Sequence, residues 1–209
     1  MKRLFLFLVL VIAGLMLLFP INKSHATQFF ITGVETKVSL TSYDTLIGAG
    51  LTPAPLGTAT VNTGVVPPDI MFPITGGIFD DATSISLIEH NGSGFSLTSG
   101  STVLNLENFL IDTGAMLLSG DASFDSTNVP DLPIFDIVWT GFSVDLRLTS
   151  QAAGAIDTIF GAGDLTGFKI GEASLNVKTG SPVPEPATML LFGVGLGGLG
   201  IFRKKLKKA

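Results

Sequence analysis

Residues 138–149 read VWTGFSVDLRLT, and apolar and polar side chains alternate along this stretch. One face carries Val138, Phe142, Val144, Leu146 and Leu148; the other carries Ser143, Asp145, Arg147 and Thr149. The same count puts Trp139 on the polar face. A period of two is that of a β-strand with one buried and one solvated face. The stretch therefore predicts a half-buried strand.

The same period recurs in residues 34–41 (VETKVSLT) and 173–178 (ASLNVK). Turn signals follow every eight to twelve residues, and Asn91-Gly92 is the sharpest because both residues tolerate the positive φ of a type I′ turn. We expect a hairpin there, and no stretch shows a convincing helical period. The chain from 27 to 180 is predicted to be all-β, a single antiparallel β-sandwich or jelly-roll-like domain.

Composition narrows the possible partners of this domain. The chain has 209 residues and no cysteine, so the core alone must hold the fold. Between residues 27 and 181, sixteen Asp and Glu face four Lys and Arg, a net charge of −12. Such a surface repels phosphate backbones, so nucleic acid is not an expected partner.

The N-terminus has the three parts of a secretory signal peptide. Lys2 and Arg3 precede a sixteen-residue uncharged run, and a small-x-small site ends at Ala26. Residues 1–26 are therefore predicted to be removed, leaving Thr27 as the first mature residue. The alternative is an uncleaved anchor, although sixteen residues fall short of the roughly 20 that a spanning helix needs.

The C-terminus, residues 181–209, begins with SPVPEP, a stiff and extended peptide. A glycine-rich apolar run follows at 187–202, long enough to insert only marginally as a transmembrane helix. The tail 203–209 ends the chain and would stay in the cytoplasm by the positive-inside rule. Its charges are Arg203, Lys204, Lys205, Lys207 and Lys208. A permanent tail anchor is the alternative to a transient one.

This three-part ending closely resembles the PEP-CTERM sorting signal of Gram-negative bacteria. The motif itself is Val183, Pro184, Glu185 and Pro186. The resemblance implies recognition by an exosortase, which cuts near the motif and releases the protein or transfers it to the cell surface. It also implies a transient stay in the inner membrane and an association with exopolysaccharide and biofilm.

Residues that could carry chemistry are few. His90 is the only histidine after the signal peptide and is predicted to be a polar residue beside a turn. The acidic residues between 121 and 136 are expected to be solvated loop carboxylates. Weak binding of Ca²⁺ or of a glycan is the alternative, and the candidate residues for it are Asp121, Asp125, Asp131 and Trp139. We expect no catalytic residue, no metal and no cofactor.

The predicted protein is thus an exported surface or matrix component that is not an enzyme. A structural or adhesive role needs only a stable acidic sandwich. A lectin-like module is the alternative, and a carboxylate-dependent glycosidase is a more distant one.

Overall fold

The computed structural model describes residues 28–81, 83–141 and 143–182. The predicted signal peptide, the Pro-Glu-Pro motif, the apolar run and the basic tail lie outside these residues. The elements are β1 (Gln28–Ile31), β2 (Glu35–Ser39), α2 (Tyr43–Gly48), β3 (Thr52–Gly57), β4 (Thr60–Asn62), β5 (Asp69–Pro73), β6 (Gly76–Asp80), β7 (Ile85–Ser99), β8 (Thr102–Asp112), β9 (Leu117–Phe124), β10 (Thr127–Trp139), β11 (Val144–Leu148), α3 (Ser150–Phe160), β12 (Lys169–Asn176) and β13 (Thr179–Pro182).

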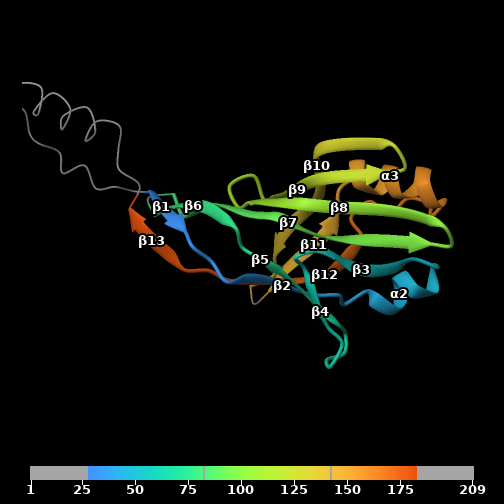
Figure 1. The fold of residues 1–209 in the computed structure, drawn as a ribbon, viewed down its shortest axis with the longest axis horizontal. Coiled ribbons are helices and arrows are strands. Elements are labelled where there is room, and N and C mark those ends of the chain that lie inside the picture. Colours follow the sequence, from blue (N-terminus) through green and yellow to red (C-terminus); the bar gives the residue numbers. More distant parts are fainter. Residues whose placement is uncertain (1–27, 82, 142, 183–209) are drawn as a thin grey trace, which may run out of the picture.

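The described strands form one antiparallel sheet that curls over itself (Figure 1). Its order is β13-β1-β6-β7-β8-β9-β10-β11-β12-β2-β5-β4, and β3 pairs with β7 away from this path. The hydrophobic core lies inside the curl. The predicted all-β antiparallel domain is confirmed, with a single continuous sheet supplying both faces of the core.

The period-two stretches 34–41 and 173–178 lie largely on single strands, β2 and β12, whereas 138–149 is not the one strand predicted: it spans the end of β10, a turn and β11. In β2, Thr36 and Val38 are buried, and in β11 Leu146 and Leu148 are buried. Phenylalanine rings fill the space between facing strands, and Phe109 lies 5.4 Å from Phe72 between ring centroids. These contacts join β5 to β8, two strands that are not neighbours in the sheet.

The predicted hairpin at Asn91-Gly92 is wrong. Residues 85–99 form the single strand β7, and Gly92 (φ +74°) lies in a bulge between His90 and Gly94. The Gly92 amide donates to the side-chain oxygen of Asn108 at 2.8 Å. A bulge uses positive φ as a turn does, but it bends the strand without reversing it. Neighbouring strand pairs carry register shifts as well, and these help the sheet to curl.

Two helices depart from the expectation that no stretch is helical. In α3, the Thr149 hydroxyl accepts the Ala152 amide at 3.1 Å, and Gly161 ends the helix with φ +66°. Threonine before a helix and glycine after it are standard start and stop signals. Small buried residues, Ala152 and Ala153, weaken the apolar periodicity and hide the helix from a pattern search.

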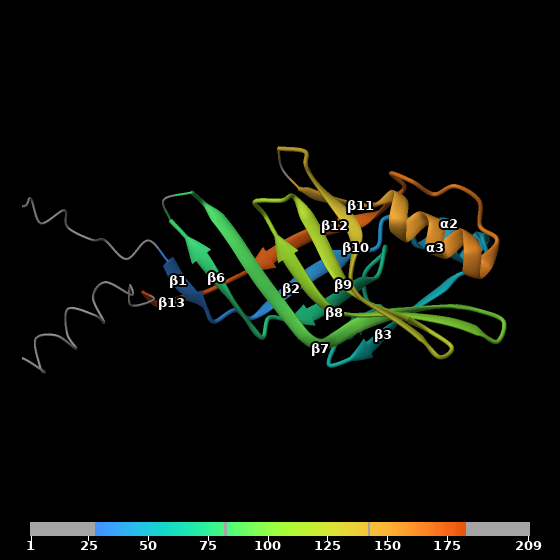
Figure 2. The ribbon, with the colours of Figure 1, turned by 90° about the horizontal axis from the view of Figure 1, so that it is seen from above.

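The two ends of the described chain lie together, because β1 pairs with β13. Both views show these strands at one end of the molecule and α2 and α3 at the other (Figures 1 and 2). We call the first the proximal end and the second the distal end. The chain enters the sorting segment directly from the proximal end, since β13 stops at Pro182.

Candidate functional site

A surface groove of about 390 Å³ opens beside α2. Its walls come from the start of α2, from β3 and from the segment that joins β4 to β5. Most of the lining is apolar: Leu40, Tyr43, Asp44, Pro53, Ala54, Pro55, Val61, Thr63, Val65, Val66, Pro68 and Ile70. Val66 is 96% exposed, although a valine side chain gains by burial. The volume lies within the range of small-molecule sites, about 300–1,000 Å³.

Tyr43 stands in this groove at the first residue of α2. The preceding Ser42 donates its hydroxyl to the Lys169 carbonyl at 2.5 Å and its amide to the Ile170 carbonyl at 3.2 Å. Leu46 buries the other side of the short helix in the core. Contacts with β12 therefore hold the tyrosine in place.

The phenol of Tyr43 is half-buried and makes no side-chain hydrogen bond within the part of the chain that the structure describes. The oxygen is open to the groove, since the buried side-chain atoms without a partner do not include it. This oxygen is therefore available to a ligand as a donor, an acceptor or a metal ligand.

His90 is not the turn-flanking polar residue that we predicted. It is 1% exposed in the core, where its Nε2 lies 2.7 Å from the Thr36 hydroxyl and its Nδ1 has no partner. Burial lowers its pKa from 6.5 to about 4, although the Phe109 backbone acts in the opposite direction. The nearby Ser93 donates its hydroxyl to the His90 carbonyl at 3.1 Å and not to the ring. The histidine therefore links β7 to β2 as a neutral ring.

Trp139 does not lie on the polar face. It pairs with Val144 on the neighbouring strand and lines an interior slot together with core residues such as Ile137. The alternation count failed because it ran straight through the β10–β11 turn, where the chain reverses and the phase is reset. Trp139 is nevertheless 59% exposed, because the slot opens beside it.

The acidic candidates are only partly brought together. Asp121 accepts the Asn108 side-chain amide at 2.8 Å and the Asp131 backbone amide at 3.2 Å. Asp121 and Asp131 line one surface depression, whereas Asp125 lies in the β9–β10 turn with φ +51°. Among residues 28–182 as described, no group of three acidic, histidine or cysteine side chains has the geometry to hold a metal ion. Trp139 lies elsewhere, in the interior slot.

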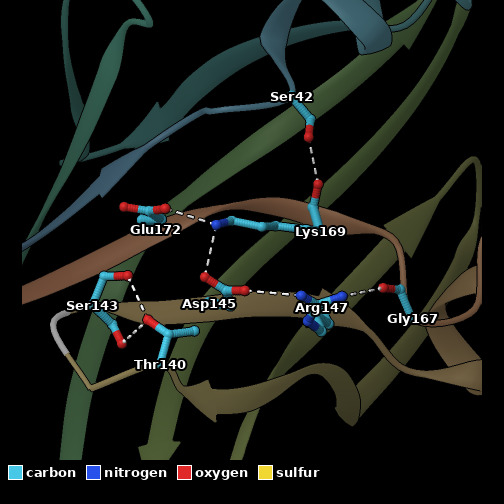
Figure 3. A network of polar contacts seen from close by, with 8 residues as sticks. All are labelled: Ser42, Thr140, Ser143, Asp145, Arg147, Gly167, Lys169 and Glu172. Carbon is cyan, nitrogen blue, oxygen red and sulfur yellow. Dashed lines mark hydrogen bonds and ion pairs between the residues drawn. The ribbon is translucent and has the colours of Figure 1, made fainter.

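An ion-pair network around the buried Asp145 includes two of the domain's four basic residues (Figure 3). Asp145 is 3% exposed, and its oxygens lie 2.7 Å from Lys169 Nζ and 2.9 Å from Arg147 Nη2. Lys169 also contacts Glu172 at 2.7 Å. The hydrogen bond from Lys169, followed by that from Arg147, holds the pKa of Asp145 below its ordinary value against the cost of burial. The network fastens β11 to β12, the strand that supports Tyr43 through Ser42.

The C-terminal segment carries a likeness to a known family. The family model of the PEP-CTERM protein-sorting motif matches residues 182–205. The chain therefore carries this sorting motif, which marks an exported protein that an exosortase processes. Over the described residues, no helix has both the length and the apolar character needed to cross a membrane.

Two solved structures share the fold, and no curated protein matches the chain significantly. The heme-binding protein HtaB of Corynebacterium glutamicum is 10% identical, with a TM-score of 0.50 over 73% of this chain and 96% of its own. The C-terminal domain of HtaA from the same organism is 11% identical, with a TM-score of 0.55 over 72% of this chain and 99% of its own. At these identities the likeness establishes the fold alone.

Proposed function

We propose that the exported domain is a surface-displayed binding module and that it holds a flat apolar ligand of the heme class in the groove at Tyr43. The observation that carries the proposal is an unpartnered phenol in an apolar groove of about 390 Å³. The heme-binding HtaB supports the choice of ligand class, because it shares the curled sheet. The proposed role is binding alone, without catalysis.

The available side chains favour Tyr43 as the iron ligand. Heme iron is held in proteins by His, Cys, Met or Tyr. The chain has no cysteine, and His90 is buried in the core away from the groove. Neither methionine of the described residues lines the groove. Tyr43 is the only tyrosine in the chain, and it lines that groove.

A hemin titration of residues 27–182, followed by absorbance, tests the proposal. We expect saturable binding that Tyr43→Phe weakens at least about tenfold, because the variant keeps the ring and removes the oxygen. Trp139→Phe is the matched control, since it changes an aromatic residue outside the groove and should leave hemin binding unchanged. If Tyr43→Phe and Trp139→Phe bind hemin equally well, Tyr43 is not part of the site. If the unmodified domain shows no saturable binding, the heme-class ligand is wrong.

The second candidate is the structural or adhesive role in an exopolysaccharide matrix that the sequence predicts. It requires only a stable domain of net charge −12 at the cell surface. A glycan-binding variant of this role is favoured by one observation, the depression that Asp121 and Asp131 share. Binding of the domain to a glycan panel, with and without Ca²⁺, separates the two candidates. Glycan binding that Asp121→Asn removes and Tyr43→Phe leaves intact would favour the second.

A further inference from the structure

The inward-facing stripe of the sheet stays exposed at the ends of two strands. Trp139 follows buried Ile137 by two residues and points to the same face, yet it is 59% exposed. Leu175 lies opposite buried Thr36 in the β12–β2 pair and is 37% exposed. Positions in phase with a core are normally covered, so this edge of the core is left open.

The opening leads into the interior slot, whose volume is about 50 Å³. A water molecule needs roughly 10–15 Å³ of such space, so the slot has room for several atoms. Its polar residues are already engaged: Thr36 contacts His90, and Thr113 accepts the Ser86 amide at 2.8 Å. Within the described part of the chain, two hydrogen-bonding side-chain atoms of the lining remain free: Nδ1 of His90 inside the slot and the indole N–H of Trp139 at its mouth.

Shape and chemistry together restrict what can enter. Apolar cavities of this kind stay dry, so water is a poor occupant. The slot is far smaller than the Tyr43 groove of about 390 Å³, so a wide ring system does not fit it. A slender apolar group with no polar tip, such as the end of an alkyl chain, matches the slot.

The sorting segment that follows the domain indicates where an alkyl chain could come from. Leu175 lies near the end of β12, seven residues before the described chain ends at Pro182 in β13, at the proximal end. The apolar run begins at Ala187, five residues further on. Five extended residues span at most about 18 Å, so a tail held in the bilayer keeps this end of the domain close to lipid.

We propose that the slot receives the end of an unbranched alkyl chain from a bilayer lipid, with Trp139 and Leu175 at its mouth. The aromatic ring at the mouth suits an interface between lipid and water. This contact would seat the domain on the membrane before the sorting tail is cut. It is independent of the proposed heme-class ligand, since it uses a different cavity.

Photocrosslinking of the full chain in vesicles tests the proposal. The vesicles contain a phospholipid with a diazirine at the end of one acyl chain, and mass spectrometry locates the labelled residues. We expect label at Trp139 and Leu175. Ala173→Phe narrows the slot and should lower this label about tenfold, whereas Val138→Phe, on the other face of β10, should leave it unchanged.

A second arm adds a free diazirine fatty acid to unlabelled vesicles. Label that arises only in this arm would overturn the bilayer source. Equal label at Val138 and Trp139 would show that the alkyl chain does not enter the slot, since the two residues lie on opposite faces of β10. If Ala173→Phe fails to fold, Leu175→Gln replaces it in the test, because this variant makes the mouth of the slot polar without filling the core. Unchanged label at Trp139 in that variant, with its circular dichroism intact, would also overturn the proposal.

Discussion

Acidification should destabilise the domain through His90. Its pKa is about 4 in the folded domain and 6.5 in the unfolded chain, so below pH 6.5 the unfolded chain binds the proton first. The stability that the neutral ring provides is therefore complete above pH 6.5 and is lost as the pH falls toward 4. The full loss is about 3 kcal/mol, and about 2 kcal/mol should be gone at pH 5.

Urea unfolding of residues 27–182 at pH 7.5 and pH 5, followed by circular dichroism, measures this loss. His90 is the only histidine in that segment, so His90→Gln removes the titration and keeps a side chain able to bond Thr36. The variant should be less stable at pH 7.5 but nearly insensitive to the change to pH 5. If both proteins lose the same free energy of unfolding between the two pH values, the assignment to His90 is wrong.

Four further predictions concern core packing, a helix glycine, charge and processing. Gly120→Ala would place Cβ 2.7 Å from a Phe ring atom and 2.8 Å from a backbone oxygen, and should cost about 1–3 kcal/mol of unfolding free energy. Gly154→Ala in α3 meets nothing within 4 Å and should instead gain about 0.5–1 kcal/mol in the same urea assay. Asp145→Asn leaves Arg147 without its carboxylate and Lys169 with Glu172 alone, and should cost about 2 kcal/mol of unfolding free energy; a wild-type-like value would count against the network. Mass spectrometry of the surface fraction should find Thr27 as the first residue and no peptide beyond about Pro186, and an intact basic tail there would refute processing.

The Tyr43 groove could not be predicted from the sequence because of the way its lining is assembled. Tyr43 is one aromatic residue in a segment with no recognised motif, and its neighbours in the groove come from three separate segments between residues 40 and 70. The only signals are the chain's single tyrosine and, ten or more residues further on, scattered prolines and valines. Such signals do not say which face of the molecule these residues share.

Sequence alone determined the features that depend on local order. Charge, apolar length and short motifs predict the signal peptide and the sorting segment; the family model confirms the sorting motif at residues 182–205, and the signal peptide stays a prediction. The period of two identified strands such as β2 and β11, because backbone pleating makes successive side chains alternate whatever lies nearby. The acidic charge of the domain is likewise a property of composition.

Tertiary structure alone decided what these residues do. His90 is buried because a bulge lets β7 continue where a turn had been predicted, and Trp139 faces the core slot because the β10–β11 turn resets the alternation. Asp145 can be buried because Lys169, 24 residues away on β12, neutralises it together with its near neighbour Arg147. In each case the deciding partner is distant in sequence or lies beyond a turn. Strand pairing and sheet curl bring such partners together, and a local pattern carries no information about either.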